Sequence, residues 1–335
     1  MSKFVPILCQ VSLDNNIPLI KENYENFKKI YNTVKIYVVC PKSQVKKFKD
    51  KLNFKEIKII NEDQILSFRD FKKMFFKLSG KINYQKKFTL RLKWYYQQIL
   101  KIIFIFKFIE KNRNLIIWDA DTIILKKIDF YKKNSSINYG NFYEYNEDYY
   151  KTNKQILKIF PKYYISFLNQ FISINKRDNK FFVENVFKEK NWKKNLKRKT
   201  VKIILQNIFK AHSKYRGSMF SEYELIGQSN YMLNKSIQKP ILFLRQNLDG
   251  KLTNLQKFIS KGLNFKHVTY EHKHIGIKNK GMLNRKQSTF GFIKIIFKNL
   301  ITHYLKTFFH FLMFFYYSND LRSNQLYKEI KKNIE

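Results

Sequence analysis

The first 118 residues alternate between apolar, strand-like runs and helix-like segments, and this alternation limits the fold more than any other feature of the chain. Strand-like runs cover residues 5–13, 34–40 and 57–60, and helix-like segments cover residues 17–30 and 42–52. Strand, helix and strand in this order form the crossover unit of a parallel sheet. The sequence therefore predicts an α/β protein with a mainly parallel sheet flanked by helices.

Weaker signals extend this pattern toward the carboxyl end. Further helices are expected over residues 64–110 and 219–234, and further short strands over residues 115–118, 241–244 and 265–270. Residues 138–153, rich in Tyr and Asn, predict a surface or substrate-facing loop. The chain contains no Gly-x-Gly-x-x-Gly and no Gly-x-x-x-x-Gly-Lys-Ser/Thr motif, which argues against a dinucleotide fingerprint and a P-loop.

Two aspartates, Asp119 and Asp121, directly follow the apolar strand at residues 115–118. In open α/β sheets, ligands bind off the carboxyl ends of the strands. Two carboxylates there can hold Mn²⁺ or Mg²⁺, whose remaining positions take diphosphate oxygens. The alternative is a pair of loop acids that cap a following helix. The strand context favours the metal–diphosphate site.

The helix that precedes this strand carries polar residues on one face. Arg91, Tyr95 and Gln98 lie at positions i, i+4 and i+7. A guanidinium group offers a fork of donors suited to a diphosphate, and Tyr and Gln side chains can fix a sugar or a base edge. The other interpretation is an amphipathic helix whose aromatic cluster at residues 94–96 packs in the core.

The segment Ser221-Glu222-Tyr223-Glu224 also has two interpretations. Ser221 and Glu224 have the spacing of a capping box, which stabilises a helix start. A carboxylate at such a helix terminus can instead deprotonate an acceptor hydroxyl group. Because Glu224 is the residue expected in the cap, Glu222 is the candidate catalytic base.

Three sequence blocks resemble a family of bacterial glycosyltransferases encoded among surface-polysaccharide genes. They are RLKWYYQQILK at residues 91–101, IIWDADTIIL at residues 116–125 and FSEYEL at residues 220–225. The resemblance covers about residues 3–275 in the same order and is loose over residues 171–186. It implies a GT-A-like fold in which Asp119 and Asp121 bind the metal and the nucleotide sugar.

A wider resemblance concerns the histidine-rich segment near residue 270. Several GT-A enzymes, such as glycogenin-like transferases, supply a late His as a third metal ligand and a nearby Lys that touches phosphate. His274 and Lys278 are similar in kind, although their spacing differs from that family. The alternative is a surface patch of His and Glu.

The charge of the chain is strongly positive, with 66 Lys and Arg against 25 Asp and Glu and a formal net charge of +41. The basic residues are spread from end to end, and no zinc-finger, RNP-type or helix-turn-helix signature accompanies them. We therefore expect no specific nucleic acid as a partner. Such a field favours anionic membrane surfaces and anionic substrates.

Residues 290–317 form an apolar run punctuated by lysines, which predicts an interfacial amphipathic helix or a helix packed on the main domain. We divide the chain into a GT-A-like domain, residues 1–285, and a basic helical tail, residues 286–335. No secretory signal or spanning segment is visible, and Cys9 and Cys40 both lie in apolar runs. We expect a cytoplasmic protein, peripheral on the inner face of the membrane.

These features predict a divalent-metal-dependent glycosyltransferase. It would transfer a sugar from a nucleoside-diphosphate sugar to a hydroxyl of a surface glycan or a lipid-linked acceptor. One alternative is a nucleotidyltransferase that uses the paired aspartates, although residues 5–16 lack the Gly-rich loop expected of it. The other is a non-catalytic basic protein associated with membrane or nucleic acid.

Overall fold

The structure is a computed structural model, and it describes most of the chain from residue 4 to residue 323. The described ranges are residues 4–79, 91–109, 114–132, 135–141, 146–158, 166–188, 191–212, 218–234, 237–244, 248, 250–270 and 286–323.

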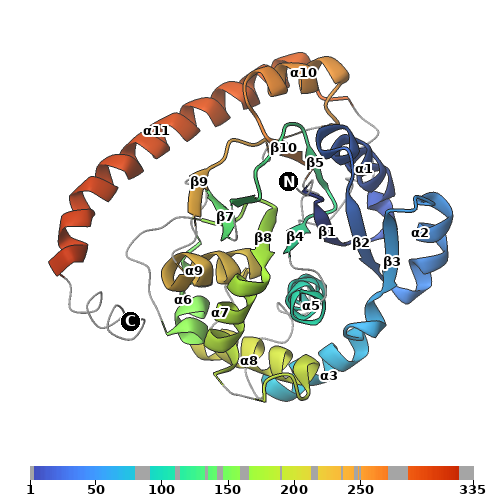
Figure 1. Cartoon of the computed structure of the whole chain (residues 1–335), viewed down its shortest axis with the longest axis vertical. Coiled ribbons are helices and arrows are strands. Elements are labelled where there is room, and N and C mark those ends of the chain that lie inside the picture. Colours follow the sequence, from blue (N-terminus) through green and yellow to red (C-terminus); the bar gives the residue numbers. More distant parts are fainter. Residues whose placement is uncertain are drawn as a thin grey trace.

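Five strands form the central sheet, in the spatial order β3-β2-β1-β4-β8 (Figure 1). They are β1 (Ile7–Val11), β2 (Lys35–Cys40), β3 (Ile57–Asn61), β4 (Asn114–Trp118) and β8 (Phe171–Asn175). The first four run parallel, and β8 pairs antiparallel with β4. The predicted α/β class with a mainly parallel sheet is confirmed, and β8 is an antiparallel addition that the sequence pattern did not indicate.

Helices cover both faces of this sheet because alternate strand residues point to opposite sides. Leu8 and Val38 face a core that also contains side chains of α1 (Ile17–Tyr31) and α2 (Val45–Lys51). Cys9 and Val39 face a second core, formed with the remaining helices of this part of the chain. These are α3 (Phe68–Ser79), α5 (Leu92–Phe108), α6 (Glu147–Leu157), α7 (Lys176–Phe187), α8 (Leu196–Ala211) and α9 (Glu222–Asn234).

Short elements connect the sheet to the rest of the molecule. The 3-10 turns η1 (Asp14–Asn16), η2 (Lys42–Gln44) and η3 (Glu62–Gln64) follow β1, β2 and β3. The strand β5 (Thr122–Ile124) pairs antiparallel with β10 (His267–Thr269), and β7 (Ser135–Gly140) lies between β6 (Tyr131–Lys132) and β9 (Ile237–Pro240). The strand expected at residues 241–244 does not coincide with a strand of the structure. The strand β9 ends at Pro240, and within residues 241–244 only Leu244 makes a bridge, to Val268.

The loop predicted over residues 138–153 is wrong for the residues that the structure describes. Residues up to Gly140 belong to β7, and α6 begins at Glu147. The Asn146 side chain accepts a hydrogen bond from the Asp148 amide, which caps the helix start, and Tyr149 and Tyr150 are buried. Tyr149 and Tyr150 of this segment therefore serve the core.

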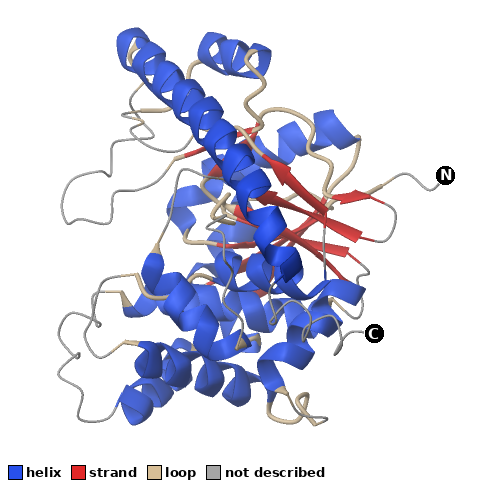
Figure 2. Ribbon diagram, turned by 90° about the vertical axis from the view of Figure 1, so that its left-hand side faces the viewer, coloured by secondary structure: helices blue, strands red, loops and turns tan. Residues whose placement is uncertain are grey.

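The carboxyl-terminal helices α10 (Asn254–Gly262) and α11 (Thr289–Ser323) lie on the outside of the molecule, and α11 crosses one side of it (Figures 1 and 2). A third core joins α11 to the main body, with Phe292 and Ile296 packed in the same cluster as Leu252 and Phe265, which flank α10 in the sequence. Among the described residues, no helix combines the length and the apolar character needed to cross a bilayer.

Cys9 and Cys40 are both free and buried, as expected of core thiols. Burial raises the pKa of the Cys9 thiol, although the nearby Lys101 charge opposes this shift. Burial, assisted by the Glu62 charge, raises the pKa of Cys40 to about 12. Both groups are therefore protonated and inert at neutral pH.

Gly227 of α9 lies directly against the buried Phe167 ring. A Cβ atom at this position would lie 2.1 Å from Cγ of the buried Phe167 ring. We expect Gly227→Ala to lower the free energy of unfolding by at least about 1–3 kcal/mol, because overpacking forces the ring to move. Gly262→Ala on α10 is the control, since its Cβ would meet nothing within 4 Å. Equal denaturant midpoints for the two variants would contradict this packing.

Candidate active site

The carboxyl end of β4 presents the two predicted aspartates on a turn that is anchored on both sides. The Asp119 amide donates to the Gln170 carbonyl (2.8 Å), and the Thr122 amide donates to the Asp119 carbonyl (3.0 Å). On the other side, the Tyr270 amide donates to the Asp121 carbonyl (2.9 Å). One backbone hydrogen bond within the turn and two to other segments of the chain therefore fix the backbone that carries both carboxylates.

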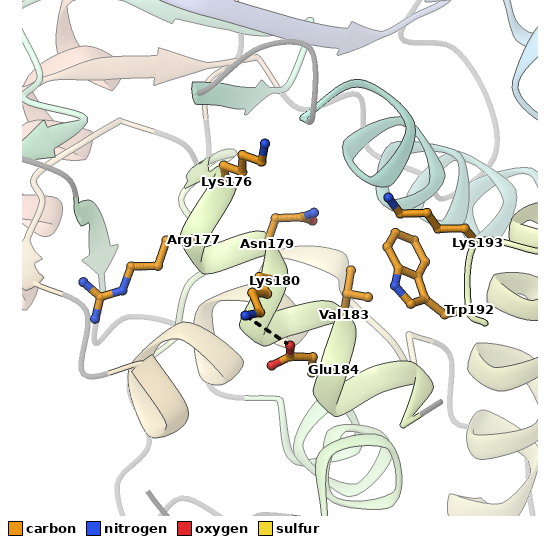
Figure 3. A pocket seen from close by; sticks show the side chains of 8 residues that line it. All are labelled: Lys176, Arg177, Asn179, Lys180, Val183, Glu184, Trp192 and Lys193. Atoms are coloured by element: carbon orange, nitrogen blue, oxygen red, sulfur yellow. Dashed lines mark ion pairs between the residues drawn. The ribbon is translucent and has the colours of Figure 1, made fainter. Parts of the chain in front are cut away.

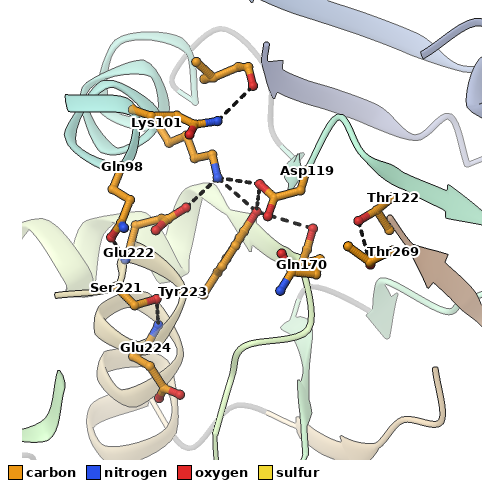
Figure 4. A network of polar contacts seen from close by, with 12 residues as sticks. Gln98, Lys101, Asp119, Thr122, Gln170, Ser221, Glu222, Tyr223, Glu224 and Thr269 are labelled. Atoms are coloured by element: carbon orange, nitrogen blue, oxygen red, sulfur yellow. Dashed lines mark hydrogen bonds and ion pairs between the residues drawn. The ribbon is translucent and has the colours of Figure 1, made fainter. Parts of the chain in front are cut away.

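A buried lysine of α5 lies at the centre of the site (Figure 4). Lys101 Nζ is 2.5 Å from Asp119 Oδ1 and 2.6 Å from Glu222 Oε1. It also donates to the Tyr223 hydroxyl (3.2 Å), which itself donates to Asp119 Oδ1 (2.7 Å). One ammonium group thus joins the strand end at β4 to the start of α9.

The charges of this cluster stabilise one another in a largely buried site. Burial alone would lower the pKa of Lys101, but the Asp119 and Glu222 carboxylates raise it above its ordinary value. Burial raises the pKa of Glu222, against the opposing effect of Lys101 and with the Asp119 charge adding to it. Burial and then the two carboxylates also raise the pKa of Tyr223, which therefore remains a hydrogen-bond donor.

The two glutamates at the start of α9 have different surroundings. Glu222 is only 2% exposed, and its carboxylate contacts Lys101. Glu224 points into the neighbouring chain segment, where it accepts hydrogen bonds from Ser166 Oγ (2.6 Å) and the Phe167 amide (3.0 Å). The Glu224 amide donates to Ser221 Oγ (3.4 Å), which is one half of the predicted cap. Glu222 thus contacts the ammonium group that also holds Asp119, whereas Glu224 binds the segment at residues 166–167.

The predicted polar face of α5 holds the segment that leads into α9. Arg91 Nη1 donates to Ser218 Oγ, and its guanidinium lies 5.6 Å from the Trp94 ring centre. The buried Tyr95 hydroxyl accepts a hydrogen bond from the Met219 amide (3.0 Å). Gln98 Oε1 accepts one from the Glu222 amide (3.2 Å). The structure thus brings Arg91, Tyr95 and Gln98 together with the start of α9, while their contact with a nucleotide stays a prediction.

Lys101, Tyr223 and Gln170 belong to the site although sequence reasoning gave them no role. Lys101 carries a signal that could have identified it, because it stands between Leu100 and Ile102 in a run of apolar residues. A lysine in such a run is buried with the helix and needs a carboxylate partner. The chain offers no comparable signal for Gln170, whose contribution to the site is its backbone carbonyl.

Asp119 and Asp121 have the chemistry of a site for a hard divalent cation. Both are partly exposed, and 18% of the Asp119 side chain is accessible even with Lys101 and Tyr223 in place. Within the described part of the chain, no cluster of three or more His, Cys, Asp or Glu side chains forms. Mg²⁺ is commonly held by one or two carboxylates together with water and substrate phosphates, so this pair fits. His274 and Lys278 lie outside the described residues.

Two surface pockets lie apart from these carboxylates. One, of about 610 Å³, lies along α7 and is lined by Lys176, Arg177 and Trp192 among others (Figure 3). The other, of about 960 Å³, lies between α1 and α10. Neither pocket has Asp119, Asp121 or Glu222 in its lining.

Comparison with known proteins gives one family match and several structural similarities. A model described as a family of unknown function, DUF6492, matches residues 16–239, which include Lys101, Asp119 and Glu222. No curated protein matches the chain.

Among solved structures, mouse xyloside xylosyltransferase 1 is similar at a TM-score of 0.38 and 8% identity, over 82% of this chain and 99% of that one. The bifunctional glycosyltransferase WbbM is similar at a TM-score of 0.40 and 11% identity, over 82% of this chain and 46% of that one, so the chain spans about half of its length. Similarity at this level concerns the course of the chain and not the chemistry of a site.

Proposed function

The chain belongs to DUF6492, a family of unknown function, and from the site within the matched region we propose that it is a glycosyltransferase. It would transfer a sugar from a nucleoside-diphosphate sugar to a hydroxyl group of an acceptor. The observation that carries this proposal is the pair Asp119 and Asp121 on an anchored turn at the carboxyl end of β4, with Lys101 and Glu222 beside it. This is the edge of an α/β sheet at which ligands bind.

In this proposal, Asp119 and Asp121 hold Mn²⁺ or Mg²⁺, which when bound neutralises the charge of the departing nucleoside diphosphate. Lys101 and Tyr223 fix the Asp119 carboxylate through Oδ1, so its orientation is set before a ligand arrives. The remaining predicted contacts, His274 as a further metal ligand and Lys278 as a phosphate contact, belong to the same proposal. So do Arg91, Tyr95 and Gln98 as parts of the nucleotide-sugar site.

Glu222 is the proposed general base toward the acceptor hydroxyl. Its carboxylate lies across Lys101 from Asp119, and both contact the same ammonium group, so a proton acceptor stands beside the proposed donor site. The acceptor would be a surface glycan or a lipid-linked glycan, and the protein would work peripherally on the inner face of a membrane.

The reaction itself is tested by its products. Purified protein is incubated with UDP-, GDP- and CDP-sugars and Mn²⁺, and the released nucleotide is identified. Release of a nucleoside diphosphate from one donor supports glycosyl transfer. A second incubation supplies a nucleoside triphosphate and a sugar phosphate, and release of pyrophosphate there would instead make the protein a nucleotidyltransferase, which also uses paired carboxylates and metal.

Glu222→Gln is expected to lower kcat by about 10²–10⁴-fold, the usual contribution of a positioned base, while donor binding is retained. The amide keeps an oxygen that Lys101 can contact but does not accept a proton at neutral pH. Steady-state kinetics and donor titration measure the two effects separately. Glu184→Gln, on the exposed side of α7, is the matched control. Full turnover by Glu222→Gln would remove Glu222 as the base.

A further inference from the structure

The two carboxyl-terminal helices expose large apolar side chains. Phe258 of α10 is 73% exposed, and Leu255, one turn earlier, is also exposed. On α11, Phe290 is 81% exposed and Phe297 is 62% exposed, and Ile301 continues the series. The α11 residues recur at intervals of seven and four, so they form one stripe along the helix.

The exposed face of α11 points away from the third core, and α10 is likewise buried on one side. Phe292, Ile295 and Ile296 of α11 pack in the third core, and the exposed stripe occupies the other side of the same helix. On α10, Gln256 and Ser260 are buried, while Leu255, Phe258 and Ile259 are exposed. The two helices lie next to each other at the outer edge of the molecule (Figures 1 and 2). Both helices therefore carry exposed apolar side chains on the outside of the molecule.

A cationic pocket adjoins this surface. The pocket of about 960 Å³ between α1 and α10 is lined by five lysines, Lys29, Lys251, Lys257, Lys261 and Lys286. Among the described residues of this lining, Glu22 is the only acidic one. Phe258 is also part of the lining, so the lysines stand directly beside the exposed apolar residues of α10.

Glu22 offsets only part of this positive charge. Its carboxylate contacts Lys251 (2.7 Å) and Lys257. Burial opposes its ionisation, but the hydrogen bonds from these two lysines lower the pKa of Glu22, so it is charged at neutral pH. In the part of the lining that the structure describes, one negative charge faces five positive ones, and the pocket is suited to a ligand that carries phosphate groups.

We propose that α10, the exposed stripe of α11 and this lysine pocket dock the protein onto an anionic lipid surface. The lysines would receive lipid phosphate groups, and the neighbouring Phe and Leu side chains would enter the boundary between headgroups and acyl chains. A nucleic acid or a free phosphate would use the lysines but would leave the apolar stripe in water. The proposal deepens the membrane location suggested above and does not depend on the transfer reaction.

Sedimentation of the full chain with phosphatidylcholine vesicles, with and without phosphatidylglycerol, tests this surface. We expect binding that requires phosphatidylglycerol and weakens as salt is added. The variant Lys29→Gln/Lys261→Gln should lower the partition coefficient by about thirty-fold, the ordinary contribution of two lysines near an anionic surface. Phe258→Ser/Phe297→Ser should also lower it, because both rings are exposed in the free protein.

Lys46→Gln/Lys49→Gln, two exposed lysines of α2, is the charge-matched control and should change binding little. The proposal is overturned if vesicles with phosphatidylglycerol do not bind, or if the control pair weakens binding as much as the pocket pair. It is also overturned if RNA or inorganic phosphate binds through the pocket lysines while vesicles do not. Because no donor is present, these outcomes are separate from success or failure of the transferase assay.

Discussion

Lys101→Met is expected to lower the free energy of unfolding by about 3–5 kcal/mol, the usual cost of removing one partner from a buried ion pair. Lys101 is the ammonium group that contacts both Asp119 and Glu222. Without it, two carboxylates face each other in a site where Glu222 is almost fully buried. Methionine fills a similar volume, so the loss measures charge rather than packing. Chemical denaturation followed by circular dichroism gives the free energy directly.

A second variant separates this electrostatic effect from general damage to α5. Lys101→Met/Glu222→Gln removes the buried carboxylate together with its counter-charge and should recover part of the lost stability. Lys107→Met, on the exposed part of the same helix, should change stability by no more than about 0.5 kcal/mol. If Lys101→Met were as stable as the parent protein, the carboxylates would not require the ammonium group, and the proposed role of Lys101 would be wrong.

The parallel part of the fold could be predicted because its information is local. The strands at residues 34–40 and 57–60 and the helix at residues 17–30 each have an apolar pattern of the right length, and the structure has β2, β3 and α1 there. The antiparallel β8 could not be predicted in the same way. Its neighbour β4 lies far away in sequence, and nothing in residues 171–175 specifies a partner or a direction.

The candidate site was only partly predictable for a related reason. Asp119 and Asp121 share one turn, so their proximity follows from the sequence alone. The contact between Lys101 and Glu222 joins residues 121 positions apart, and it depends on how α5 and α9 pack against each other. Sequence periodicity placed Arg91, Tyr95 and Gln98 on one face, but not the segment that this face contacts.

The ammonium group of Lys101 also determines how the Asp119 carboxylate is held for ligand binding. Lys101 and Tyr223 both contact Oδ1 of Asp119, so that carboxylate is held in one orientation while part of its surface stays accessible. Asp121 is held through its backbone carbonyl and lies two residues further along the turn. A ligand that binds both carboxylates therefore needs the Asp121 side chain, whereas the two ion pairs of Lys101 involve Asp119 and Glu222. Substitution of Asp121 therefore tests ligand binding, whereas substitution of Lys101 tests stability.

Asp121→Asn is expected to weaken Mn²⁺-dependent nucleotide binding by about 100-fold or more, because even residues beside a metal ligand change affinity by about 10–100-fold. Calorimetric titration with UDP, GDP and CDP, with and without Mn²⁺, measures the effect and identifies the base of the donor. Asp129→Asn, an exposed aspartate after β5, is the control and should bind as the parent protein does. Unchanged binding by Asp121→Asn would exclude the metal–diphosphate role of the pair. If the folded parent protein bound none of the three nucleotides, the glycosyltransferase proposal itself would fail, because its donor site would not exist.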